Sequence, residues 1–143
     1  MHRAVVMLAV LAAGIACAPL VKADPCNNQA CLQKSFAEAG GPFIGSWAAH
    51  GEGVTVNADG SGVETSRRGT LNFNLNSVQT STTPWDTAYG GVVSGFLERG
   101  AFVTIRLVDG GRGMAFSAGG GDNDFPFCKI VNGSKVNPDD CGA

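Results

Sequence analysis

The chain contains a succession of short segments in which apolar and polar residues alternate, and this pattern limits the folds that it can adopt. In the clearest segment, Leu71, Phe73 and Leu75 are separated from one another by asparagines. Alternation with a period of two is typical of a β-strand that buries one face and exposes the other. The sequence therefore predicts a half-buried strand here.

Turn residues separate these segments at steady intervals. The stretch 58–62 reads Ala-Asp-Gly-Ser-Gly and joins alternating runs at 54–57 and 63–68, which predicts a β-hairpin. A second hairpin is expected between residues 90–97 and 101–108, through the turn residues Glu-Arg-Gly. Further strands are expected from Phe43 onward, at 112–118 and at 125–131.

About eight short strands with turn chemistry between them indicate an all-β fold. A small antiparallel up-and-down β-barrel, similar to the lipocalin and calycin barrels, is favoured because closure removes exposed strand edges. A two-sheet β-sandwich is the alternative. Before the strands, good helix formers at 34–39 precede Gly40-Gly41-Pro42, which predicts one or two helical turns.

The N-terminus has the pattern of a cleavable secretion signal. His2 and Arg3 give a basic start, an apolar run extends from Ala4 to Val21, and Val21-Lys22-Ala23 has small or medium residues where signal peptidase cuts. The expected organisation is a signal peptide at 1–23, a lead-in with a short helix at 24–42, and a β-domain at 43–143.

Two alternatives to cleavage and secretion follow from the same segment. The apolar run is 18 residues long, near the ~20 that a membrane span needs. The sequence Gly14-Ile15-Ala16-Cys17 also resembles a bacterial lipobox, in which the cysteine is lipidated. Lipidated Cys17 would attach the protein to the cell envelope, whereas cleavage after Ala23 predicts a secreted protein.

The charge of the mature chain argues against a nucleic-acid partner. The full chain has 10 basic and 12 acidic residues, and the signal removes Arg3 and Lys22 but no acid. The remaining eight basic and twelve acidic residues give a net charge of −4, so no phosphate-binding surface is expected.

Four cysteines remain after signal removal, and an even count in a small exported chain predicts two disulfides. Three pairings are possible, of which Cys26–Cys31 and Cys128–Cys141 are favoured because each is local and flanked by turn residues. A zinc site is the alternative, but an oxidising compartment opposes four reduced thiols.

Gly45-Ser46-Trp47 resembles the G-x-W motif that opens the first strand of lipocalin-like barrels. In that superfamily the tryptophan plugs one barrel end and an arginine from a late strand packs over it. The resemblance implies this role for Trp47, with Arg106 or Arg112 as the covering arginine.

A broader resemblance covers most of the mature chain. Residues 43–47, His50-Gly51, the stretch 54–62 and the closing Cys141-Gly142-Ala143 look like small exported proteins of actinobacteria, including mycobacteria. The resemblance implies an exported β-protein with a Cys128–Cys141 bridge, and it implies no activity and no catalytic residue.

Candidate site residues are few. His50, the one histidine left after signal removal, is a candidate general base or ligand. Trp85 and Tyr89 lie on a polar stretch, where exposed aromatic rings suit sugar stacking or a protein partner. Asp122 and Asp124 are candidates for a cation site in a glycine-rich loop, because carboxylates ligate hard cations.

The sequence lacks the common motifs of hydrolases, metalloproteases and nucleotide-binding enzymes. We therefore expect a non-catalytic binding or interaction protein of the envelope or extracellular space, with no cofactor. The predicted ligand site is the barrel end near Trp47, His50, Trp85 and Tyr89, for an apolar or amphipathic small molecule or a protein partner. The alternatives are a carrier with an apolar ligand in the barrel lumen and a secreted hydrolase that uses His50.

Overall fold

The computed structural model describes residues 32–80, 86–122, 126–136 and 138–141. Two short α-helices, α1 (Phe36–Ala39) and α2 (Pro138–Cys141), and two 3-10 turns, η1 (Gly41–Phe43) and η2 (Asp109–Gly111), accompany the strands. The strands are β1 (Leu32–Ser35), β2 (Gly45–Ala49), β3 (Glu52–Val56), β4 (Ser61–Ser66), β5 (Gly69–Thr80), β6 (Thr87–Gly95), β7 (Phe102–Val108), β8 (Gly113–Ala118), β9 (Gly121–Asp122), β10 (Phe127–Val131) and β11 (Ser134–Lys135).

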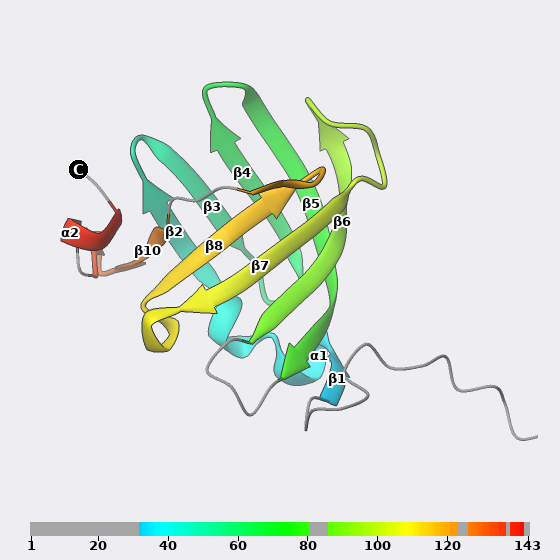
Figure 1. Ribbon diagram of the computed structural model, residues 1–143, viewed down its shortest axis with the longest axis horizontal. Helices are drawn as coiled ribbons and strands as arrows, with labels where there is room; N and C mark the ends of the chain where they lie inside the picture. Colours follow the sequence, from blue (N-terminus) through cyan, green and yellow to red (C-terminus); the bar gives the residue numbers. More distant parts are fainter. Residues whose placement is uncertain (1–31, 81–85, 123–125, 137, 142–143) are drawn as a thin grey trace, which may run out of the picture.

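The strands form a closed antiparallel β-barrel, which confirms the predicted fold class over the β-sandwich. Strands β2 to β8 pair consecutively, β10 pairs with β2, and the β10–β8 pairing closes the circle (Figure 1). The barrel therefore has eight strands in up-and-down order, with β1, β9 and β11 added at its margins. The Cys128–Cys141 disulfide ties α2 to β10.

The predicted hairpins are confirmed. At the β3–β4 turn, Asp59 accepts hydrogen bonds from the backbone N–H and hydroxyl of Ser61, at 2.9 and 2.6 Å. These bonds lower the pKa of Asp59, and Gly60 supplies the positive φ that the turn requires. The β6–β7 hairpin likewise turns at Gly100, where φ is 87°.

Inward-facing apolar side chains fill the barrel. Leu71, Phe73 and Leu75 of β5 all face the interior and are at most 2% exposed, as their alternation predicts. Strand β5 is longer than expected, and a register irregularity between Leu75 and Ser77 lets Val78 face inward as well. Gly62 leaves the space that the Phe73 ring occupies, because a Cβ at Gly62 would overlap that ring.

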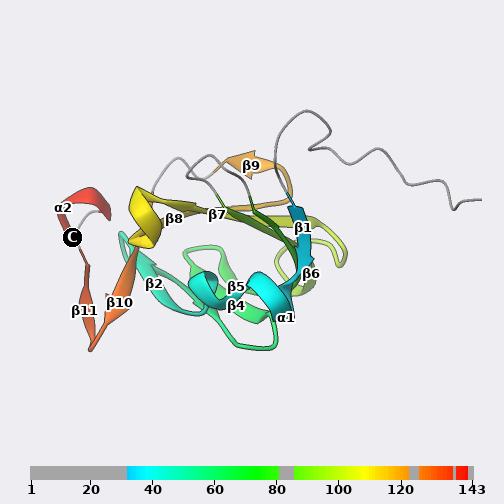
Figure 2. The ribbon, with the colours of Figure 1, turned by 90° about the horizontal axis from the view of Figure 1, so that it is seen from below.

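The lead-in closes one end of the barrel. Strand β1 pairs with β5, and α1 and η1 follow it across the end that is lowest in Figure 1 and faces the viewer in Figure 2. Ser35 and Glu38 form a capping box that begins α1, and Phe36 and Phe43 are buried with ring centroids 6.4 Å apart. The short helix was predicted from the sequence, whereas β1 was not, because its residues Leu-Gln-Lys-Ser show no alternation.

Trp47 plugs this closed end, but the residue that covers it differs from the expectation. The indole Nε1 donates a hydrogen bond to the Phe43 carbonyl at 3.1 Å, and the Lys129 Nζ lies 5.4 Å from the ring centroid. Lys129 pairs directly with Trp47 across β10 and β2, so both side chains are on the same face. The prediction of Arg106 or Arg112 is therefore wrong: Arg106 is exposed on β7, and Arg112 forms an ion pair with Asp109 at 2.6 Å.

Candidate binding site at the open end of the barrel

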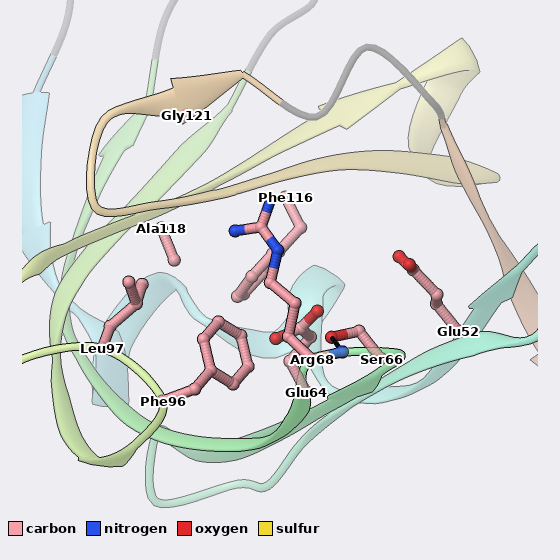
Figure 3. A pocket seen from close by; sticks show the side chains of 9 residues that line it. All are labelled: Glu52, Glu64, Ser66, Arg68, Phe96, Leu97, Phe116, Ala118 and Gly121. Atoms are coloured by element: carbon pink, nitrogen blue, oxygen red, sulfur yellow. Dashed lines mark hydrogen bonds between the residues drawn. The ribbon is translucent and has the colours of Figure 1, made fainter.

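The opposite end of the barrel holds a pocket of about 150 Å³. The residues that line this mouth pocket (Figure 3) come from or adjoin the β2–β3, β4–β5 and β6–β7 turns and the β8–β9 hairpin. Its lining residues are Glu52, Glu64, Ser66, Arg68, Phe96, Leu97, Phe116, Ala118 and Gly121. Polar and charged groups come from β3, β4 and the β4–β5 turn, while β6–β7 and β8 supply apolar walls.

Glu64 forms the polar floor of the mouth pocket. It is 4% exposed, and its Oε2 is buried without a hydrogen-bond partner. The backbone places it there: Glu64 pairs with Val54 of β3 and Leu71 of β5, whose side chains both face the interior. An acidic side chain thus occupies a core-facing position at the open end.

Burial raises the pKa of Glu64, because a low-dielectric environment disfavours the charged carboxylate. The polar side chain of Ser66 acts in the opposite direction and lowers this pKa. The charge of Glu52 also raises the pKa, and that of Arg68 lowers it. Of the two carboxyl groups that line the pocket, Glu64 is therefore less solvated than Glu52, and it has charges of both signs nearby.

Arg68 and the aromatic walls define the entrance. Figure 3 shows the Arg68 side chain extending from the β4–β5 turn across the pocket, with Glu52 to one side and Phe96 to the other. The Phe116 side chain is 2% exposed and also packs against Phe73 in the core, with ring centroids 5.5 Å apart. Phe116 therefore separates the mouth pocket from the filled interior.

Among the candidate binding residues that the sequence singled out, Trp47, His50 and Tyr89 have described side chains, and none of these three lines the mouth pocket. Trp47 is 1% exposed in the core, beside the closed end. His50 is exposed on the β2–β3 turn at the open end, where its φ is 46°, and it is not among the lining residues. Tyr89 lies on β6, donates a hydrogen bond to the Gln79 Oε1 at 2.8 Å, and packs against Phe102.

Several predicted residues lie wholly or partly outside the described part of the chain. Trp85, Asp124 and the Cys26–Cys31 pair belong to undescribed segments, and only the backbone of Asp122, in β9, is described. Among the described residues, no group of three or more His, Cys, Asp or Glu side chains is arranged to hold a metal ion.

The Cys128–Cys141 disulfide is present, with its Cα atoms 5.5 Å apart, and such a bond fits an extracellular protein. In the described segments, no helix combines the length and apolarity that a membrane crossing demands.

Glu64 was not predicted as a site residue, because the alternation in β4 does not show which set of alternate residues faces the barrel interior. Val63 is the apolar residue of that stretch, and a half-buried strand is expected to turn it inward. The structure instead turns Gly62 and Glu64 inward and leaves Val63 partly exposed. The glycine two residues before Glu64 was the available signal, since glycine in a strand often marks a close approach inside a small barrel.

A second hollow, of about 260 Å³, lies between η2 and the C-terminal segment and is lined in part by Val108, Pro126 and Val136. Its charged side chains, Asp109 and Arg112, pair with each other. The mouth pocket differs from this hollow because it contains a buried polar atom that lacks a protein partner.

No protein-family model matches the chain, and neither the curated proteins nor the solved structures provide a significant match.

Proposed function

We propose that this protein is an exported, non-catalytic binding protein of the cell envelope or extracellular space, and that the mouth pocket is its binding site. The observation that carries the proposal is the buried, unpartnered Oε2 of Glu64 at the floor of a pocket that opens to solvent. Buried polar atoms are nearly always paired in folded proteins, so an orphan at a pocket floor supports a ligand that supplies the missing partner.

The size of the pocket limits the ligand. A volume of about 150 Å³ accommodates several water molecules or a ligand of a few non-hydrogen atoms. Below Phe116 the barrel side chains are almost fully buried, so the described interior is packed rather than hollow. These observations favour a small ligand at the mouth over a lipid-sized ligand in the lumen, which would need several hundred Å³.

Export is supported by the secretion-signal pattern and the resemblance to exported actinobacterial proteins, and the Cys128–Cys141 bond fits the same compartment. The denaturing mass of protein recovered from the exporting host tests this part. A chain that begins at Asp24 in the medium supports secretion. A lipidated chain that begins at Cys17 would instead establish an envelope anchor.

Binding at the mouth is tested by nuclear magnetic resonance, with a set of small soluble compounds titrated into the ¹⁵N-labelled protein. We expect at least one compound to shift the amide signals of Glu64, Phe96 and Leu97. The variant Ala118→Leu fills the pocket and is expected to abolish these shifts. Shifts confined to the closed end or the outer strand faces, or none at all, would contradict the proposed site.

The hydrolase alternative stays a prediction, and no feature of the mouth pocket favours it. His50→Ala is the matching variant, and loss of a hydrolytic activity in this variant would revive the alternative.

A further inference from the structure

The charges around the mouth pocket identify a ligand class for it. Glu52 and Glu64 supply two carboxyl groups and Arg68 supplies one guanidinium, so the ionised lining has a formal charge of −1. The other walls, formed by residues of the β6–β7 loop, β8 and β9, are uncharged. An anionic ligand would face both carboxylates, whereas a single positive charge would neutralise the pocket.

The hydrogen-bonding requirement narrows this class further. An ionised carboxylate is an acceptor only, so the free Oε2 of Glu64 needs a donor. Arg68 also lines the pocket, but its guanidinium does not donate a hydrogen bond to the Oε2 of Glu64. A primary ammonium group brings both the charge and three N–H donors. A quaternary ammonium brings the charge without donors, and a neutral alcohol brings a donor without the charge.

The walls define the rest of the ligand. Phe96 presents aromatic surface beside Leu97 and Ala118, whereas Phe116 is almost fully buried, and this surface suits a short apolar body attached to the charged group. The pocket volume of about 150 Å³ limits that body to a few carbon atoms.

We infer that the mouth pocket binds small primary alkylammonium ions, with Glu64 as the counter-ion and Phe96 and Leu97 as the apolar contact. This inference rests on the proposed function of the mouth pocket as a binding site. Arg68 keeps the pocket from carrying two uncompensated charges, and a bound ammonium supplies the donor that Glu64 Oε2 lacks.

The test is a titration of the full mature protein with n-butylammonium. Nuclear magnetic resonance monitors the amide signals of the residues that line the mouth pocket. We expect saturable shifts at Glu64, Phe96 and Leu97, with weaker binding of n-butanol and of tetramethylammonium. Glu64→Gln keeps the side-chain size and removes the charge, and it is expected to weaken butylammonium binding by about tenfold or more. Ala118→Leu is expected to block binding by filling the pocket.

Two acidic residues provide matched controls. Glu52→Gln lowers the negative charge of the lining but leaves the Glu64 contact, so a smaller loss of affinity is expected. Glu98 is exposed on the β6–β7 loop and is not a lining residue, so Glu98→Gln is expected to leave the affinity unchanged. Equal losses in all three variants would indicate a diffuse charge effect and overturn the role of Glu64.

A pH titration of the unaltered protein keeps the inference testable if Glu64→Gln disturbs the fold. Butylammonium affinity is expected to fall as acid protonates Glu64, and the Glu52→Gln variant, which still contains Arg68 and Glu64, is expected to retain this fall. If other compounds bind at the mouth but butylammonium does not, the ammonium inference is wrong while the proposed site stands. If no compound shifts the amide signals of Glu64, Phe96 and Leu97, the proposed function itself is wrong.

Discussion

Replacement of Trp47 by phenylalanine tests how the barrel is closed. Trp47 is 1% exposed, its Nε1 donates a hydrogen bond to the Phe43 carbonyl at 3.1 Å, and Lys129 lies over its ring. Through these contacts one side chain links β2 to η1 and to β10. Trp47→Phe keeps an aromatic ring in the core but removes the donor and part of the buried surface.

The expected cost follows from these two losses. A buried carbonyl left without its partner costs about 1–3 kcal/mol. The lost part of the indole corresponds to about two methylene groups, each contributing ~0.8 kcal/mol when buried. We therefore expect Trp47→Phe to lower the free energy of unfolding by about 3 kcal/mol, a large part of the 5–15 kcal/mol typical of a small domain.

Urea unfolding followed by far-ultraviolet circular dichroism measures this loss, because the substitution itself changes the fluorescence. The midpoint is expected to fall while the m-value stays the same. Lys129→Met is the matched control, since it keeps the aliphatic stem and loses only the cation–π contact, at about 0.5–1 kcal/mol. A loss below about 0.5 kcal/mol for Trp47→Phe, typical of a surface site, would refute this account of closure.

Three further substitutions test other parts of the fold. Gly90→Ala is expected to cost more than about 1 kcal/mol in thermal unfolding, because a Cβ there would overlap the backbone of β5, whereas Gly41→Ala has open space and should be nearly neutral. The double variant Cys128→Ala/Cys141→Ala should lose about 3 kcal/mol in urea, from the 13-residue separation, and an unchanged midpoint would contradict a constraining role for the bond. Glu64→Gln should become more stable relative to the unaltered protein as the pH rises above 4.5, the ordinary pKa of a glutamate, as measured by urea unfolding at each pH. Burial raises the pKa of Glu64 in the folded state, so the stability that it contributes below its unfolded pKa is lost as pH rises through the folded pKa. A difference between the two proteins that does not vary with pH would contradict this burial effect.

Much of the barrel was predictable because its information is local. The alternation of Leu71, Phe73 and Leu75 with asparagines specifies both a strand and its inward face. The Asp59-Gly60 turn specifies a hairpin through side-chain hydrogen bonds and a positive φ. Neither property depends on distant parts of the chain.

The closed end was predicted only in part. The G-x-W resemblance placed Trp47 correctly as a plug, but the cation over it was assigned to an arginine. That cation is Lys129. It lies over Trp47 because β10 pairs with β2, although the two strands are far apart in the sequence. Strand β1 was missed for a similar reason, since its pairing with β5 rather than its own composition makes it a strand.

Periodicity and turn chemistry act over a few residues, and they therefore predicted the class of fold, the two hairpins and the inward face of Leu71, Phe73 and Leu75. The inward direction of Glu64 and the pocket at the open end, by contrast, depend on how the strands pair in three dimensions. The physical reason is register: Glu64 pairs with Val54 and Leu71, and neighbouring residues on adjacent strands share a face. A one-residue shift would have exposed Glu64 and buried Val63, and within β4 only Gly62 favours the observed arrangement.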